Sequence, residues 1–153
     1  MGIRIVIDST SDVTNEIIEK YNIKMVPLTV NFENGSFLDK VELNSKEFFE
    51  KLEAAEKLPT TTLVSPGAFV EAFSEILMDG DRVLGLFLAS EFSGTYDSAL
   101  MAKNMIGSDD IHIIDTRSVC LGAFALILEA IELVHQNKTI EEIVEELEKL
   151  KEK

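Results

Sequence analysis

The 153-residue sequence is poor in the residues from which many sites are built: it has one cysteine, three prolines, two histidines and no tryptophan. A single cysteine, Cys120, excludes an internal disulfide, which fits a reducing compartment and makes the cytoplasm the expected location. The two histidines and Cys120 lack metal-ligand spacing, so we expect no metal site and no cofactor. Cys120, beside Leu121, is interpreted as a small buried hydrophobic residue rather than as a reactive thiol.

Basic residues are also scarce, with 14 Lys and Arg against 28 Asp and Glu, for a net charge of -14. Nucleic acids and anionic membrane surfaces need clustered basic residues, so both are excluded as expected partners. No stretch approaches the ~18 uninterrupted apolar residues of a membrane span, and the amino terminus lacks a secretory signal, so no stable membrane insertion is expected. The longest apolar run, from Val119 to Leu128, is interpreted as a buried helix.

Strand and helix patterns alternate along the chain. Apolar segments bounded by turn residues predict strands at Ile3 to Ile7, Met25 to Phe32, Val83 to Ala89 and Ile111 to Ile114. Asn34-Gly35 predicts a turn. Helix starts are predicted by the capping residues Asn44 with Glu47, Ser65, and Thr139 with Glu142, and helical periodicity predicts helices at about 15–21, 44–58, 66–77, 95–106, 119–135 and 140–150. This alternation predicts a single α/β domain over residues 1–153, with three layers: a mostly parallel sheet and helices on both of its faces.

Hydroxyl side chains follow the ends of several predicted strands. They form the clusters Ser9-Thr10-Ser11, Ser90 with Ser93-Gly94-Thr95, and Thr116 with Ser118, and Thr60-Thr61-Thr62 lies before a predicted helix. The crevice beyond the carboxyl ends of parallel strands is the favoured ligand site of such a sheet. A helix that begins at Ser93-Gly94-Thr95 would offer unpaired N–H groups, and Gly94 would let a ligand come close to the backbone. The sequence therefore predicts that an anion binds at this turn.

The missing motifs narrow the kind of anion. Neither G-x-x-x-x-G-K nor G-x-G-x-x-G occurs, and Arg117 is the only cation in these loops, which disfavours a nucleotide phosphate. A singly charged carboxylate with an uncharged body fits better. Ser93 lacks the G-x-S-x-G context of a serine hydrolase. Asp8 and Asp115 both end strands and allow a magnesium pair or an acid–base pair, although Asp in such loops more often accepts backbone N–H bonds.

Four motifs together carry a family resemblance. They are Asp8-Ser9-Thr10-Ser11-Asp12, Pro59-Thr60-Thr61-Thr62 with Ser65-Pro66-Gly67, Ser93-Gly94-Thr95-Tyr96 with Ser98-Ala99, and Asp115-Thr116-Arg117-Ser118. In this order and spacing they resemble the DegV family of bacterial fatty-acid-binding proteins, over the whole chain.

The resemblance implies a lipid-binding carrier and not an enzyme. Family members bind a long-chain fatty acid, and some present its carboxylate to a separate fatty acid kinase subunit that forms an acyl phosphate for lipid metabolism. By this resemblance Thr61 and Ser93 hold the carboxylate. Thr62, Gly94 and Thr95 complete the expected ligand site, and the supporting residues are Asp8, Ser9, Asp115 and Ser118.

The sequence departs from the family pattern in two ways. Where the family often has Ser-Gln-Pro after Pro-Thr-Thr, this chain has Thr62-Leu63-Val64, which keeps a hydroxyl but loses an amide and a rigid residue. Family members are also nearly twice as long, so the second domain that covers the acyl chain is expected to be absent here and lipid binding to be weaker. Two alternatives stay open: a metabolite-handling enzyme of phosphotransfer type that uses Asp8, Asp115 and Ser93, and a half-domain that serves only as an interaction module.

Overall fold

The computed structural model describes residues 2–33, 35–41 and 44–151, and its main sheet is parallel throughout. Four strands form this sheet in the order β2-β1-β6-β7: β1 (Ile3–Asp8), β2 (Lys24–Val26), β6 (Arg82–Phe87) and β7 (Ile111–Asp115). The helices between and after them are α1 (Asn15–Lys20), α3 (Pro66–Met78), α4 (Thr95–Ile106), α5 (Cys120–His135) and α6 (Ile140–Lys151). The predicted α/β class is confirmed.

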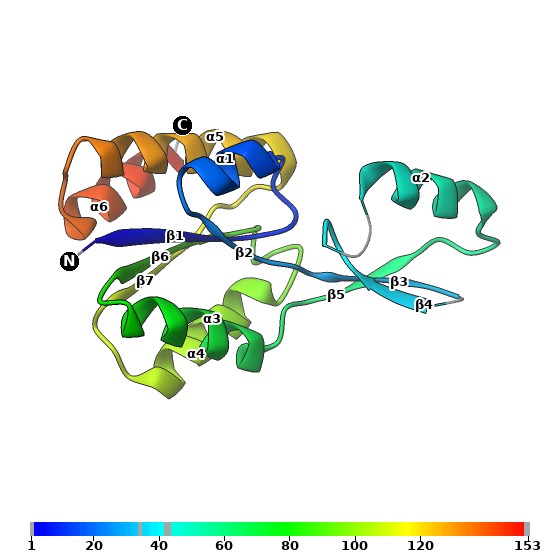
Figure 1. The fold of residues 1–153 in the computed structure, drawn as a ribbon, viewed down its shortest axis with the longest axis horizontal. Helices are drawn as coiled ribbons and strands as arrows, with labels where there is room; N and C mark the ends of the chain where they lie inside the picture. The colour runs from blue at the N-terminus through cyan, green and yellow to red at the C-terminus, as the bar shows by residue number, and fades with distance from the viewer. Residues whose placement is uncertain (1, 34, 42–43, 152–153) are drawn as a thin grey trace.

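Helices cover both faces of the parallel sheet, which gives the predicted three layers (Figure 1). Successive residues of a strand point to opposite faces, and β1 shows this directly. Ile5 and Ile7 belong to a core shared with α5 and α6, whereas Val6 belongs to a second core with Phe69 and Phe73 of α3. The sheet therefore separates two hydrophobic cores. Because helices cover both of its faces, a ligand can reach it at the ends of the strands.

A second, smaller sheet was not anticipated from the sequence. It is antiparallel, in the order β4-β3-β5, and consists of β3 (Thr29–Phe32), β4 (Gly35–Leu38) and β5 (Thr60–Thr62). The predicted strand from Met25 to Phe32 is in fact two strands, because Pro27 has no N–H to donate and the Leu28 N–H bonds to the Ser9 hydroxyl at 3.0 Å. The threonine cluster predicted to precede a helix is itself the edge strand β5.

The small sheet and helix α2 (Ser45–Ala54) project from one side of the body (Figure 1). Helix α2 packs on the small sheet through aromatic residues, with 6.0 Å between the ring centres of Phe48 and Phe32. It ends at Ala54, four residues before the predicted end at Leu58, because the backbone turns to extended angles at Ala55; Leu58 is 85% exposed. Of the predicted turn at Asn34-Gly35, Asn34 lies outside the described residues.

The predicted helix caps are present. The Asn44 and Ser65 side chains accept hydrogen bonds from the N–H groups of Glu47 and Ala68, at 2.8 and 3.2 Å. Thr139 and Glu142 exchange side-chain-to-backbone bonds at 3.1 and 3.2 Å, so α6 begins with the reciprocal capping pair that the sequence predicts.

The start of α5 differs from the prediction. Cys120 is exposed, not buried, and has a positive φ of 52°. Its N–H donates to the Thr10 carbonyl, and it forms an isolated bridge with Ser11, so the first turn of α5 lies beside the loop that follows β1 and not on the sheet. The apolar run is therefore only partly a buried helix: Ala123 and Ile127 are buried, but Leu121 is 71% exposed. Within the described ranges, no helix is both long enough and apolar enough to cross a bilayer.

Candidate ligand site at the strand ends

The turn that follows β6 organises its own hydroxyls. Ser93 is half-buried, and its Oγ accepts the Thr95 N–H at 3.2 Å and lies 3.0 Å from Thr95 Oγ1. Gly94 is the N-cap of α4 and supplies no side-chain hydrogen bond to the helix. Helix α4 therefore begins with Ser93 and Gly94 at its positive end, which suits an anionic ligand.

The segment after β5 packs against this turn. The Val64 N–H donates to Thr95 Oγ1 at 3.4 Å, and a Cβ placed on Gly94 would lie only 2.9 Å from Leu63 Cδ2. These two contacts hold the segment directly after β5 against the Ser93 turn, although the two are far apart in the sequence.

Thr61 and Thr62 lie on opposite faces of the small sheet. Thr61 is directly opposite Val30 on β3, so its side chain shares a face with the buried Val30. Thr62 shares the other face with Asn31, whose Nδ2 donates to Thr62 Oγ1 at 2.7 Å. Both threonines are exposed, and among the described residues the Thr61 hydroxyl has no hydrogen-bond partner. Thr60, on the face of Thr62, is also exposed and without a hydrogen-bond partner among the described residues, so Thr61 is the free hydroxyl of β5 on the Val30 face.

Asp8 and Ser9 hold the loops at the strand ends in place by buried hydrogen bonds. Asp8 is only 2% exposed, and its carboxylate accepts from Thr10 N at 2.8 Å, from the Thr10 hydroxyl and from Leu88 N at 2.7 Å. Burial raises the pKa of Asp8, and the bonds from Thr10 and Leu88 offset part of that rise. Through Leu88 the carboxylate ties the end of β1 to the end of β6. Ser9 is equally buried and holds Leu28.

Asp115 and Ser118 fix the same turn from the other side. The Ser90 hydroxyl donates to Asp115 Oδ2 at 2.6 Å, and Arg117 N donates to Oδ1 at 2.9 Å. The Ser118 carbonyl accepts the Ala89 N–H at 3.1 Å. Burial raises the pKa of the Tyr96 phenol, and the charge of Asp115 raises it further. The loop after β7 therefore anchors both ends of the segment from Ala89 to Ser90.

Two residues at this corner were not assigned a site role from the sequence. The Lys40 ammonium donates to the Ser11 carbonyl, so the fold adds a second cation to loops where only Arg117 was expected. Leu63 touches Gly94. Neither could have been found from motif spacing, because each reaches the site by a contact between distant segments.

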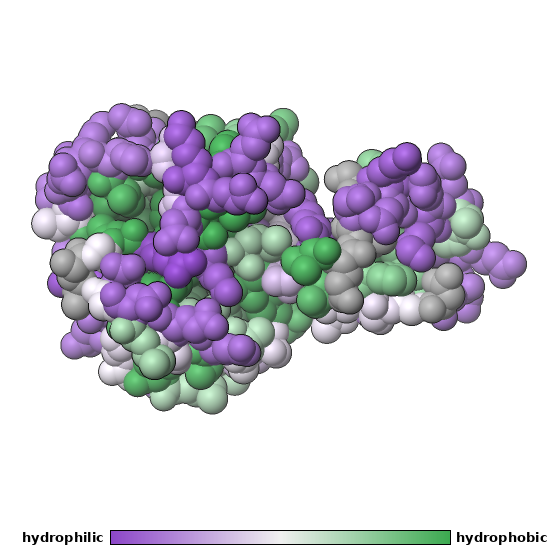
Figure 2. All heavy atoms as spheres, viewed as in Figure 1, coloured by the Kyte–Doolittle hydropathy of each residue, from purple (hydrophilic) through white to green (hydrophobic). Residues whose placement is uncertain are grey.

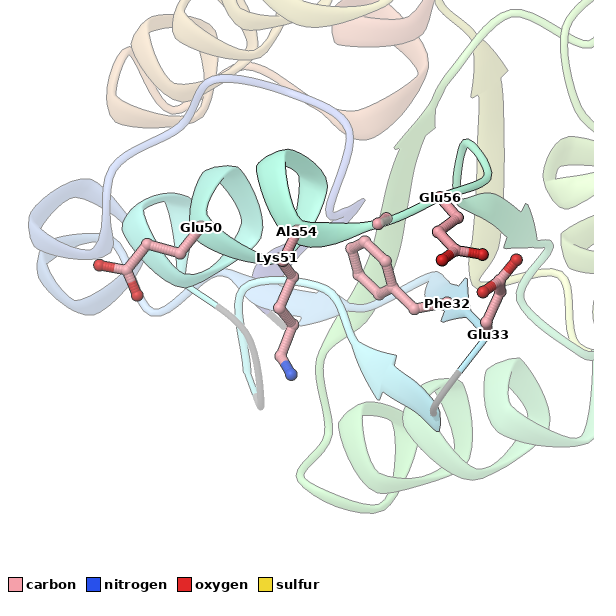
Figure 3. A pocket seen from close by; sticks show the side chains of 7 residues that line it. Phe32, Glu33, Glu50, Lys51, Ala54 and Glu56 are labelled. Atoms are coloured by element: carbon pink, nitrogen blue, oxygen red, sulfur yellow. The ribbon is translucent and has the colours of Figure 1, made fainter.

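Two pockets in the described part of the chain lie near the small sheet and the loop after β7, and neither is lined by Thr61 or Ser93. One, of about 360 Å³, lies between the loop after β7, including Thr116 and Arg117, and the ends of α5 and α6. The other, of about 490 Å³, lies between β3 and α2; Figure 3 shows the Phe32 ring directed into it and the Glu33 and Glu56 carboxylates side by side at one end. Within the described part of the chain, no group of three or more His, Cys, Asp or Glu side chains could hold a metal ion.

A family model and individual sequences both match this chain to the same family. The model of the DegV family, described as "Uncharacterised protein, DegV family", matches residues 2–153. A DegV domain-containing protein of Clostridium perfringens is 40% identical over 145 residues, which are 95% of this chain and 52% of the relative. The chain thus spans about half the length of the curated relatives it matches.

Solved structures agree with the fold. A DegV family protein from Thermus thermophilus, whose structure is described as one of fatty acid binding, superposes with a TM-score of 0.91 at 32% identity, covering 99% of this chain and 54% of the other. The Streptococcus pneumoniae fatty acid kinase B3 protein, loaded with linoleic acid, superposes with a TM-score of 0.85 at 25% identity, covering 100% and 55%.

Proposed function

This chain belongs to the DegV family, and on that premise we propose that it binds a long-chain fatty acid by its carboxylate where β5 meets the Ser93 turn. One observation supports the proposal: Leu63 and Val64, which directly follow β5, contact Gly94 and Thr95 in the Ser93 turn, and the Thr61 hydroxyl two residues earlier has no hydrogen-bond partner among the described residues. Two hydroxyls and a helix N-terminus can hold a singly charged carboxylate.

The remaining predicted residues have graded roles in this proposal. Thr61 and Ser93 donate to the carboxylate; Gly94 begins α4, but Leu63 Cδ2 occupies the space beside it that the sequence left open for a ligand. Thr95 holds the Ser93 side chain in place, and Thr62 acts through Asn31 and the pairing of β5. Asp8, Ser9, Asp115 and Ser118 position the loops. We also propose that the chain is a single α/β domain, of which the small sheet and α2 are an extension.

The protein acts as a carrier in the cytoplasm and not as the phosphotransferase, in this proposal. The Asp8 carboxylate already accepts three hydrogen bonds within the fold, so it is not free to bind a metal ion or a proton donor in phosphotransfer. The likeness to the fatty acid kinase B3 protein suggests a separate kinase subunit as the partner that receives the presented carboxylate. Incubation of the protein with fatty acid and ATP alone should form no acyl phosphate.

The test is mass spectrometry of an organic extract of the purified protein, followed by palmitate and oleate titrations. We expect bound fatty acid, and we expect Thr61→Ala with Ser93→Ala to weaken binding by at least about 100-fold, since each lost bond to a charged group is worth roughly 1.5–3 kcal/mol.

Two control variants separate binding from folding. Ser65→Ala removes a serine that also accepts a backbone N–H at a helix start, at a cost of about 1 kcal/mol. Thr60→Ala removes the exposed threonine on the opposite face of β5. Both should bind as the wild type does. An extract without fatty acid, together with no thermal shift on adding oleate or palmitate, refutes the proposal.

A further inference from the structure

Two large apolar side chains border the hydroxyls of the proposed site. Leu63 directly follows Thr62 and is 42% exposed, and Phe92 directly precedes Ser93 and is 69% exposed. Of the two, Leu63 has a contact with the turn: its Cδ2 lies against the Gly94 backbone. A ligand that approaches Ser93 would meet it there.

The contact with Gly94 uses only part of the Leu63 side chain, which stays 42% exposed. The next residue, Val64, is 3% exposed and fills the buried position at the end of this segment. The Val64 N–H bond to Thr95 Oγ1 fixes the backbone here and needs no particular side chain at position 63. Leu63 therefore packs on the glycine of the turn and still exposes apolar surface that a ligand can contact.

We propose that Leu63 is a specificity-determining residue, which selects acids whose first carbons beyond the carboxyl group carry no polar substituent. The inference rests on the proposed function. With the carboxylate at Thr61 and Ser93, the adjacent methylenes pass the isobutyl group of Leu63. A hydroxyl on carbon 3 would then lose water against an apolar wall and gain no partner, which weakens binding.

The experiment compares palmitate with 3-hydroxypalmitate, each used to displace a fluorescent polyene fatty acid. We expect the wild-type protein to prefer palmitate by about 10- to 100-fold, the range that an apolar wall achieves against one added hydroxyl. Leu63→Asn has a similar shape and offers an amide to the hydroxyl, so the preference should fall to within about threefold. Leu63→Met, which keeps apolar volume, should retain it.

Leu58→Asn is the matched control, because Leu58 is also an exposed leucine beside β5 but precedes the strand. It should keep the wild-type preference, and thermal unfolding of all four proteins shows that each is folded. If the wild type prefers palmitate and Leu63→Asn keeps the full preference, or if the wild type has none, the role of Leu63 is wrong while fatty-acid binding stands. If neither the wild type nor Leu58→Asn binds either acid, the proposed function itself has failed.

Discussion

At the scale of single residues, Asp8 shows how a buried charge is made tolerable. Its two carboxylate oxygens are used separately: Oδ1 accepts from Thr10, and Oδ2 accepts from the backbone of Leu88. Burial is the largest influence and raises the pKa of Asp8 from its ordinary value of 3.8. The charged form is therefore costly for the fold, even though its hydrogen bonds join two strand ends.

Asp8→Asn should lower the free energy of unfolding by about 1–3 kcal/mol, because one amide oxygen cannot accept from both Thr10 N and Leu88 N. The difference from wild type should also depend on pH. Because the pKa of Asp8 is higher in the folded state than in the unfolded state, the native state binds the proton more readily. The stability that proton binding contributes is therefore fully present below a pH of about 3.8, and it is lost as the pH rises through the pKa of the folded state. Urea unfolding from pH 3.5 to 7 should show the wild type losing its advantage as pH rises. A gap that widens with pH contradicts this.

At the scale of elements, β6 is the strand on which the site depends. It pairs with β1 and β7 and leads into the Ser93 turn. Gly85 in its centre leaves room for the buried Phe87 ring, which packs 4.8 Å from the ring of Phe69 on α3. The glycine is thus part of the packing between the sheet and α3, two residues before the end of β6.

Gly85→Ala should destabilise the protein by about 1–3 kcal/mol, because the new Cβ would lie 2.6 Å from Phe87 Cε2 in a core that cannot expand. The control is Gly67→Ala in the first turn of α3, where the nearest atom is Ser65 Oγ at 4.0 Å. There the added methyl should be neutral or stabilise by up to about 1 kcal/mol, through reduced freedom of the unfolded chain. Urea denaturation compares the two, and equal effects would contradict the packing argument.

At the scale of the whole molecule, the net charge of -14 opposes the approach of any anion, including the proposed ligand. The distribution of polarity matters as well: Figure 2 shows hydrophilic atoms over α2, and hydrophobic atoms exposed between α2 and the body. The molecule as a whole therefore repels carboxylates at long range.

Added salt should speed the binding of a fatty acid carboxylate, because the Debye length falls from about 30 Å at 0.01 M to about 8 Å at 0.15 M and screens the repulsion. We expect the stopped-flow association rate to rise about two- to tenfold over that range. The corresponding uncharged fatty alcohol, at concentrations below those at which either ligand aggregates, should show no such rise. A carboxylate rate that falls with salt would indicate steering by local cations such as Lys40 and Arg117 instead.

Much of the architecture follows from local signals in the sequence. The alternation of Ile5, Val6 and Ile7 between two faces, the caps at Ser65 and Thr139, and the hydroxyl loops after β1, β6 and β7 depend on neighbours in the chain. Strand periodicity, capping and turn chemistry act over a few residues, so the class of fold and the chemistry of each loop could be predicted.

Only the tertiary structure decided which loops meet. Pairing between β3 and β5 turns the Thr60 to Thr62 segment into an edge strand with Thr61 and Thr62 on opposite faces. Packing of Leu63 on Gly94 joins that strand to the Ser93 turn, and the path of the chain after β4 brings Lys40 to Ser11. The hydrogen bond from Cys120 N–H to the Thr10 carbonyl holds the start of α5 beside the loop after β1, where Cys120 is exposed. These outcomes depend on contacts between distant segments, whose energies no local pattern encodes, so the sequence determined the parts of the site and the fold determined their partners.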